Sequence, residues 1–362
     1  MHITALELRN FRNYERTAVA LENGVTVIHG SVGAGKTNLL EAVYFGAMAR
    51  SFRTSNDREL VRFGERSARV ALNSVNSVGE HRFEVGLEPG RVKSVKVDGV
   101  KRDRLLEVEG RPLMCVFMPD RLELVKGPGA ARRGHVDSVV AALRPAQRDH
   151  RSLYGRALAQ RNVLLSRVRA GAASRSSLGS WNRELAARGV ELMEARANAI
   201  ELIAPHFARH AAALGLSRGP EIRYRPASSA TTAAELEAEL EASIGGDVQR
   251  GFTYAGPHRD DLRIEEAGRE LRRFGSQGQQ RLALLALLLA ERDALEDAAS
   301  SRPVLLLDDV MSELDQARRR LLLDLLLDRG QTLITTADPS SALPGQVEGI
   351  ASIEVSGGRV DG

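Results

Sequence analysis

The segment Gly30 to Thr37 has the residue types and spacing of the Walker A phosphate-binding loop, G-x-x-x-x-G-K-[ST]. Glycines let such a loop curl so that its N–H groups point at phosphate oxygens, and the Thr37 hydroxyl is a ligand for Mg²⁺. The apolar residues 25–28 predict a strand before the loop, and residues 38–48 predict a helix whose N-terminus attracts anions. A glycine-rich turn with an unrelated lysine is the alternative. We expect a nucleotide to bind to Gly30, Ser31, Val32, Gly33, Ala34, Gly35, Lys36 and Thr37, with Lys36 on its β and γ phosphates.

An acidic pair follows the apolar residues 304–307, which predict a buried parallel strand. Asp308 and Asp309 come directly after that strand, as in a Walker B motif. We expect Asp308 to hold Mg²⁺ through water, together with Thr37, and Asp309 to orient or deprotonate the attacking water. A strand followed by an acidic turn is the alternative for this segment alone. The predicted catalytic residues are Asp309 and Lys36.

The segment before the leucine-rich residues 282–295 carries a third motif, made of Ser276, Gly278, Gln279 and Arg281. Ser, Gly and Gln at a helix start form another group of phosphate-binding backbone amides. Because one ATP needs only one such group, we expect this motif to contact a nucleotide bound to a second copy of the chain. A helix with Ser276 as its N-cap is the alternative. Ser312 and Asp315, just after the acidic pair, are expected to line the same dimer interface.

Length and composition limit the class of protein. A chain of 362 residues with 43% hydrophobic residues is large enough for one large or two ordinary domains. A single cysteine, Cys115, excludes disulfides and cysteine-based metal sites. Residues 1–8 alternate as a strand does and lack the apolar stretch of a secretory signal, and the leucine-rich run 282–290 is too short to span a bilayer. We therefore expect a cytoplasmic protein without a membrane partner.

Charge is distributed unevenly, although the net charge is only +4. Residues 144–175 hold eight arginines and a single acid, Asp149, whereas the later helical segments are rich in glutamate. One interpretation is a basic face that meets the phosphates of a nucleic acid. The other is a solvated face whose arginines pair with the acidic helices beside it.

Periodicity changes along the chain. Short alternating segments predict an antiparallel sheet, at residues 69–72, 83–87 and 92–97. Helical periodicity from about residue 145 to 216 predicts two antiparallel helices. A short strand and a glutamate-rich helix follow, at residues 221–224 and 233–243. We expect an α/β head formed by residues 1–144 and 251–362, into which a mainly helical domain, residues 145–250, is inserted.

The motifs resemble known families. Ser-x-Gly-Gln before a helix, followed by Walker B and Ser-Glu-Leu-Asp, resembles the ATP-binding-cassette (ABC) ATPases. Leu8 to Tyr14, Gly256 to Leu262 and Ser276 to Arg281 are similar to segments of the RecF family of bacterial recombination and repair proteins, which belongs to the SMC-type ABC ATPases. This resemblance covers essentially the whole chain. It implies a P-loop ATPase head like that of SMC proteins, with an antiparallel sheet subdomain and a helical domain in place of a long coiled coil.

The resemblance also implies an activity. In the RecF family ATP is sandwiched between two protomers, so that Walker A of one faces the signature serine of the other. The implied function is an ATP-dependent homodimer on DNA with weak, DNA-stimulated ATP hydrolysis, acting in recombinational repair, replication restart and the SOS response. The implied partners are RecR and RecO, which cooperate in loading RecA at gaps. Contacts to the nucleotide base and ribose are implied for Arg9, Asn10, Phe11 and Arg12, for which a strand end and turn is the alternative.

Two residues typical of ABC ATPases are missing. There is no glutamine between Walker A and Gln147, and Asp120 is a weak substitute. No histidine occurs beyond His258, and the place expected for a switch histidine offers Thr335, Thr336 and Asp338. With an aspartate at position 309 in place of the usual glutamate, we expect slow hydrolysis, on the timescale of a switch.

Two other classes of protein fit the sequence less well. The ATPase subunit of a membrane transporter predicts a shorter insertion before the signature and a conventional Gln and His pair, neither of which the chain has. A P-loop kinase or GTPase gives the second phosphate motif no role, and the chain has no Asn-Lys-x-Asp motif for guanine.

Within Gly256 to Asp261, His258 and Arg259 are open to two interpretations, a tight turn or a ligand contact.

Overall fold

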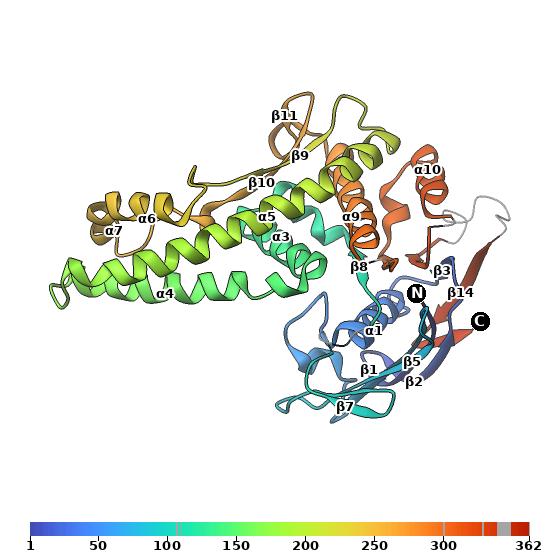
Figure 1. Cartoon of the computed structure of the whole chain (residues 1–362). Helices are drawn as coiled ribbons and strands as arrows, with labels where there is room; N and C mark the ends of the chain where they lie inside the picture. The colour runs from blue at the N-terminus through green and yellow to red at the C-terminus, as the bar shows by residue number, and fades with distance from the viewer. Residues whose placement is uncertain (106–107, 109, 300, 328, 339–348, 362) are drawn as a thin grey trace. The chain divides into compact units, whose positions relative to one another are not determined.

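The computed structural model describes residues 1–105, 108, 110–299, 301–327, 329–338 and 349–361 (Figure 1). The chain forms two compact units: a sheet unit, Met1–Arg121 with Leu295–Gly362, and a helical unit, Leu122–Ala294. The expected insertion, residues 145–250, falls wholly within the helical unit. Its expected boundaries remain a prediction.

A six-stranded sheet carries two of the predicted motifs in the sheet unit. Its strand order is β15 (Arg359–Asp361), β14 (Ile350–Ser356), β3 (Val25–His29), β13 (Thr332–Thr336), β12 (Val304–Leu307) and β8 (Met114–Phe117). Neighbouring strands run parallel, except for the antiparallel pair β14 and β15. The strands predicted at residues 25–28 and 304–307 are confirmed as β3 and β12, whose apolar residues are buried as in sheets covered on both faces. Because β3, β12 and β13 are parallel, the segments that follow them meet at one edge.

A second, antiparallel sheet of the sheet unit confirms the expected subdomain. Its strand order is β2 (Tyr14–Ala20), β1 (His2–Phe11), β4 (Ala68–Val75), β5 (Glu80–Leu87), β6 (Ser94–Val97) and β7 (Val100–Arg102). Helix α1 (Lys36–Met48) contacts β1, β4 and β5 of this sheet and β13 of the parallel sheet. Residues 39–47 of α1 are all buried, so the helix that begins at the phosphate-binding loop is held between the two sheets. The unit also contains η1 (Asp57–Leu60), η7 (Val310–Glu313) and α10 (Gln316–Leu326).

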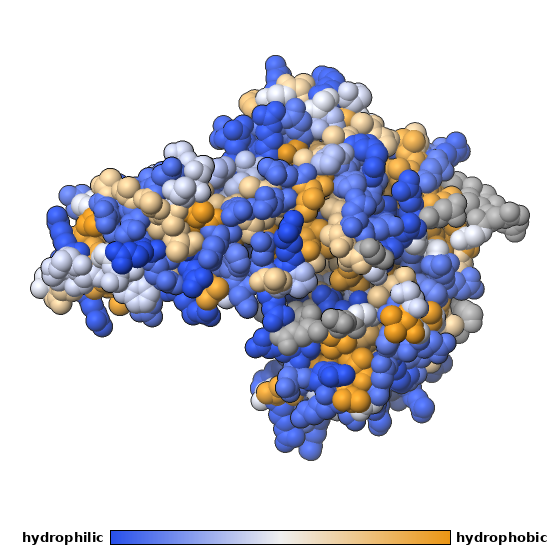
Figure 2. Space-filling view, in the orientation of Figure 1, coloured by the Kyte–Doolittle hydropathy of each residue, from blue (hydrophilic) through white to orange (hydrophobic). Residues whose placement is uncertain are grey.

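The helical unit is built around α4 (His150–Arg169) and α5 (Gly179–Ala213), which run antiparallel and side by side, as expected (Figure 1). Its other helices are α2 (Glu123–Lys126), α3 (Gly129–Leu143), α6 (Ala233–Ala242), α7 (Ile244–Arg250), α8 (Leu271–Phe274) and α9 (Gln277–Ala299), the last of which continues into the sheet unit. A three-stranded antiparallel sheet packs against α5, in the order β11 (Arg269–Glu270), β10 (Asp261–Glu266) and β9 (Glu221–Arg225). On the face shown in Figure 2, α4 and α5 carry mostly hydrophilic residues.

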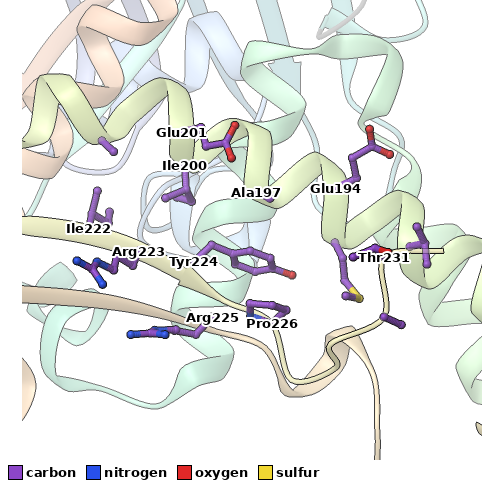
Figure 3. Close-up of a pocket in the computed structure, with 14 residues that line it drawn as sticks. Glu194, Ala197, Ile200, Glu201, Ile222, Arg223, Tyr224, Arg225, Pro226 and Thr231 are labelled. Atoms are coloured by element: carbon purple, nitrogen blue, oxygen red, sulfur yellow. The ribbon is translucent and has the colours of Figure 1, made fainter. Parts of the chain in front are cut away.

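A largely apolar groove of about 570 Å³ lies between α5 and β9 (Figure 3). None of the predicted site residues lines it. Among the described residues, none of the helices combines the length and the apolar run that a bilayer span requires.

Candidate nucleotide-binding site

The loop between β3 and α1 has a backbone that requires glycine. Gly30, Gly33 and Gly35 have φ angles of 151°, 83° and 119°, in the region where side chains are strained. A Cβ at Gly30 would lie 2.1 Å from the Val355 carbonyl oxygen, and one at Gly35 would lie 2.5 Å from Asn13 Nδ2. Glycine is therefore required at positions 30 and 35 for two reasons: the loop needs these positive φ angles, and other segments of the same chain lie too close for a side chain.

The turn between β1 and β2 braces this loop. Asn13 Nδ2 donates to the Ala34 carbonyl at 3.1 Å, and the Tyr14 hydroxyl donates to the Gly35 carbonyl at 3.0 Å. Asn38 Nδ2 on α1 donates in turn to Asn13 Oδ1 at 2.8 Å. Burial raises the pKa of Tyr14 well above its usual range, so its hydroxyl stays a donor. Sequence reasoning did not assign Asn13 or Tyr14 to the site, although both lie in a segment that it had singled out.

Lys36 folds over the loop. Its Nζ donates to the carbonyls of Gly30 and Ser31, at 2.8 and 2.9 Å. Burial lowers the pKa of Lys36, while the carboxylates of Asp309 and Asp308 raise it. Since an ammonium group has three donors, one N–H remains for an anion in addition to these two contacts.

The two residues predicted to hold a metal ion lie in contact. Thr37 Oγ1 donates to Asp308 Oδ1 at 2.8 Å, although 271 positions separate them in the sequence. Thr335, at the end of β13, donates to the same oxygen at 2.6 Å and accepts from the Asp309 backbone N–H at 3.0 Å. The Thr335 side chain is 1% exposed, so one buried hydroxyl bridges both aspartates of the acidic pair. The sequence placed Thr335 near the expected switch histidine but did not predict this contact.

Asp309 has an unusual backbone and a free carboxylate oxygen. Its φ of 48° lies in the left-handed region, which costs a non-glycine residue about 1 kcal/mol or more. Its Oδ1 is buried and has no hydrogen-bond partner among the described residues. Buried carboxylate oxygens are rarely left unpaired. Together with the Thr37 hydroxyl and the Asp308 carboxylate, this oxygen gives a set of hard donors that fits Mg²⁺ and its bound waters.

Arg12 forms an ion pair within the sheet unit. Its guanidinium donates two bonds to the Glu41 carboxylate, at 2.7 and 2.8 Å, and a third to the Glu59 carbonyl. The Glu41 side chain is fully buried on α1, and Arg53 contacts it at 3.4 Å. The Arg12 side chain is thus engaged with α1 in this structure, which favours the turn interpretation for this residue.

The other residues of the N-terminal segment differ in exposure. Phe11 is fully buried and packs against Phe45, with ring centroids 5.6 Å apart, so its ring belongs to the core. Asn10 Nδ2 donates to Glu65 at 3.0 Å, and Arg9 is exposed. Of the four residues expected at the base and ribose, Arg9 is exposed, Asn10 and Arg12 are partly buried, and Phe11 is buried in the core.

The signature motif forms the start of α9. Ser276 N donates to Gln279 Oε1 at 2.8 Å, and Gln279 N donates to Ser276 Oγ at 3.2 Å, a reciprocal pair of the capping-box type. Gln279 Nε2 also donates to Glu266 at 2.9 Å. Gly278 is exposed and Arg281 partly buried. The capping interpretation therefore describes Ser276 in a single chain, and the contact of Ser276, Gly278, Gln279 and Arg281 with a second copy remains a prediction.

The residues expected at the dimer interface after Walker B also have local roles. Ser312 Oγ donates to the Asp309 carbonyl at 2.8 Å, and Asp315 caps α10 by accepting from Arg318 N at 2.9 Å. Thr336 Oγ1 donates to the Asp338 carbonyl at 3.0 Å. The side chain of Asp120, the weak substitute for the missing glutamine, lies outside the described residues.

The Gly256 to Asp261 segment is a structural centre of the helical unit. Arg196 on α5 donates to Asp137 on α3, to Asp260 and to the Pro257 carbonyl, at 2.7, 2.9 and 2.7 Å. Asp260 is fully buried, and its pKa is raised by that burial, against which the contacts from Tyr224 and Arg196 act. These bonds tie α3, α5 and β9 to the start of β10.

His258 belongs to this structural centre. Its Nδ1 accepts from the Tyr154 hydroxyl on α4 at 2.7 Å, and its Nε2 donates to the Thr253 carbonyl at 3.1 Å. Burial, followed by the charges of Arg259 and Arg133, lowers the pKa of His258, which fits the neutral tautomer that these bonds need. The tight-turn interpretation therefore describes His258.

The fold and the loop geometry define the class of protein. The parallel sheet has a glycine loop after β3 and an acidic pair after β12, and the chain adds an antiparallel sheet subdomain and a mainly helical unit. This combination is the architecture of an ABC-type P-loop ATPase head. The Smc head domain derived from Pyrococcus furiosus shares this fold, with a TM-score of 0.59 at 18% identity over 99% of this chain and 95% of that one. The chain matches the RecF/RecN/SMC N terminal domain family over residues 2–345.

Individual proteins narrow the class. Two proteins named DNA replication and repair protein RecF are similar over nearly their full lengths. The one from Synechococcus sp. (strain JA-2-3B'a(2-13)) is 36% identical over 99% of this chain and 97% of its own length. The one from Acidothermus cellulolyticus is 37% identical over 95% and 96%. A solved structure of the recombination mediator protein RecF with ATP has a TM-score of 0.88 and 30% identity, over 99% of this chain and 97% of that one. The chain belongs to the RecF family of SMC-type ABC ATPases.

Proposed function

We propose that this protein binds ATP with Mg²⁺, hydrolyses it slowly, and through ATP joins two copies on DNA during DNA repair in the cytoplasm. One observation carries the proposal: Thr37 and Asp308 come from distant segments and meet at 2.8 Å beside a glycine loop that carries Lys36. The relatives are named for DNA replication and repair, and a RecF structure is described with ATP.

Each residue of the site has a distinct task in this proposal. The backbone amides of the loop and the Lys36 ammonium bind the phosphates, while Thr37 and Asp308 hold Mg²⁺. The Mg²⁺ ion, when bound, neutralises charge that develops on the phosphates. Asp309 orients or deprotonates the attacking water with its unpaired Oδ1. Thr335 keeps both aspartates in position through its two hydrogen bonds.

Dimerisation is the part of the proposal that couples ATP to DNA. The start of α9 presents Ser276 and Gly278 at the surface, where N–H groups at a helix N-terminus attract a phosphate. We propose that this surface completes the site of a second copy, so that ATP bridges two chains. A ligand that binds between subunits favours the dimer until hydrolysis removes it. RecR and RecO are proposed partners, by family membership, in loading RecA at gaps.

The arginines of α4 support DNA binding over pairing with the acidic helices. Arg156 and Arg167 are exposed and have no ion-pair partner among the described residues. Arg151 pairs with Asp137 of α3, at 3.5 Å. Arg161 is the exception, since it is buried and bound to Asp247 at 2.8 Å. The glutamates of α6 thus leave the exposed arginines of α4 available to phosphates.

Two binding measurements test the proposed function. In a fluorescent-ATP titration with ATP and GTP as competitors, ATP should compete better, and Lys36→Met should abolish binding; unaltered affinity in Lys36→Met would contradict the assignment of the loop. DNA binding with ATP should weaken steeply as salt rises from about 50 to 200 mM, because binding releases counterions from the DNA and the free energy gained by releasing them falls as the salt concentration rises. Binding that does not change over this range would contradict the phosphate contacts.

A further inference from the structure

Two arginines contact one exposed aromatic ring in the helical unit, and a third contacts the backbone of one of them. The guanidinium carbons of Arg250 and Arg259 lie 4.8 and 5.1 Å from the centroid of the Tyr254 ring. Arg169, the last residue of α4, donates from Nη1 to the Arg250 carbonyl at 3.3 Å. All three arginines are exposed, and Tyr254 is 56% exposed. We refer to Arg169, Arg250, Arg259 and Tyr254 as the arginine cluster.

The backbone beneath the cluster is held from several sides. Thr253 N donates to Asn162 Oδ1 on α4 at 2.8 Å, and Tyr254 N donates to Asp247 Oδ1 on α7 at 3.0 Å. His258 is fixed between Tyr154 and the Thr253 carbonyl. These bonds order the chain from residue 253 to 259, so the side chains that it presents are pre-organised for a ligand.

The charge of the cluster is not compensated within the helical unit. Among the described residues, no carboxylate forms an ion pair with Arg250 or Arg259. Asp247, the acid beneath the cluster, is fully buried and already pairs with Arg161 at 2.8 Å. A ring face orients a guanidinium group but carries no net negative charge. Uncompensated like charges that share one ring repel one another, and a bound anion would reduce that repulsion.

We propose that the arginine cluster binds the phosphate backbone of a nucleic-acid strand. This inference rests on the proposed DNA binding and assigns residues to it. The distances to the shared ring put the two guanidinium carbons within about 10 Å of each other. A strand of B-DNA offers a phosphate about every 3.4 Å along the axis, so the two guanidinium groups lie close enough to contact neighbouring phosphates of one strand. One guanidinium group can donate two parallel N–H bonds to a phosphate. Such contacts position a protein on DNA without distinguishing one base sequence from another.

The test compares charge removal with charge retention. Anisotropy of a labelled duplex of about 30 base pairs is measured with ATP at about 50 to 200 mM salt. Losing two phosphate contacts should weaken binding of R250A/R259A about 100-fold at the lowest salt and reduce the salt slope by about 2. R250K/R259K should keep the slope, because it keeps both charges. Arg223→Gln, which removes an exposed arginine of β9 paired with Glu221, is the matched control and should bind as the wild type does.

The ring is tested separately. Tyr254→Phe keeps the aromatic face and should bind DNA normally, whereas Tyr254→Leu should bind several-fold more weakly. Thermal melting of each variant checks its fold, and R250K/R259K carries the charge comparison if alanine prevents folding. Wild-type affinity and slope in R250A/R259A, or loss of the slope in R250K/R259K, would overturn the inference. A wild-type protein that fails to bind DNA would instead refute the proposed function.

Discussion

Replacing Thr335 with valine removes one hydroxyl and almost no volume. In the wild type this hydroxyl donates to the Asp308 carboxylate at 2.6 Å and accepts from the Asp309 N–H at 3.0 Å. A hydrogen bond to a charged group contributes about 1.5–3 kcal/mol, and a buried donor left unpaired costs about 1–3 kcal/mol. Partial relaxation recovers some of this, so we expect Thr335→Val to lower the free energy of unfolding by about 2–4 kcal/mol.

The same substitution should slow hydrolysis more than it weakens ATP binding. The left-handed turn at Asp309 is held by the bond to Thr335, and a catalytic group misplaced by about 1 Å costs roughly 100-fold in rate. We therefore expect kcat to fall about 100-fold in Thr335→Val, while the affinity for ATP without Mg²⁺ changes little, because the glycine loop and Lys36 are untouched.

Urea denaturation, fluorescent-ATP binding and steady-state hydrolysis measure these effects. Thr335→Ser keeps the hydroxyl and serves as the control, with stability within about 1 kcal/mol of the wild type and most of its kcat. Wild-type kcat in Thr335→Val, or an equal loss in Thr335→Ser and Thr335→Val, would contradict a positioning role for the Thr335 hydroxyl.

A buried ion pair in the sheet unit and a buried histidine in the helical unit should each contribute to stability. Arg12→Ala leaves the buried Glu41 with the longer Arg53 ion pair and a hydrogen bond from the Ser51 hydroxyl, so urea denaturation should show a loss of about 2–4 kcal/mol; a loss below about 0.5 kcal/mol would contradict the structural role of the Arg12–Glu41 pair. Burial lowers the pKa of His258 in the folded chain. As the pH falls, the histidine of the unfolded chain therefore takes up a proton first, near pH 6.5, while His258 of the folded chain is still neutral. The stability that neutral His258 contributes is thus lost as the pH falls below about 6.5. The fall in melting temperature between about pH 7.5 and 5.5 should therefore be smaller in His258→Gln than in the wild type, and equal falls would argue against a buried neutral imidazole.

Local patterns allowed much of the fold to be predicted. The glycine loop and its flanking strand and helix follow from residue types that force one backbone path, and the predicted 25–28 strand and 38–48 helix are β3 and α1. Alternation likewise predicted the antiparallel strands β4 and β5. Such features depend on residues a few positions apart, which a sequence displays directly.

Beyond the Thr37 and Asp308 pair, contacts between distant segments were not predicted. Thr335 reaches the acidic pair only because β13 lies beside β12. The order of strands in a sheet cannot be predicted from the hydrophobic pattern of any single strand. Asn13 and Tyr14 brace the glycine loop through backbone carbonyls, which carry no sequence signature. The pairing of Arg12 with Glu41 was not predicted, because Glu41 lies among buried, mostly apolar residues of α1.

We propose that ATP joins two copies of the chain through the glycine loop of one and the start of α9 of the other. Light scattering of the full chain with Mg²⁺ and a slowly hydrolysed ATP analogue tests it most directly. We expect the 39.4 kDa chain to double its mass with the analogue and not with ADP, and we expect Ser276→Arg to bind the analogue but stay monomeric. A wild-type chain that is saturated with the analogue and remains a monomer, or a Ser276→Arg variant that dimerises normally, would contradict it.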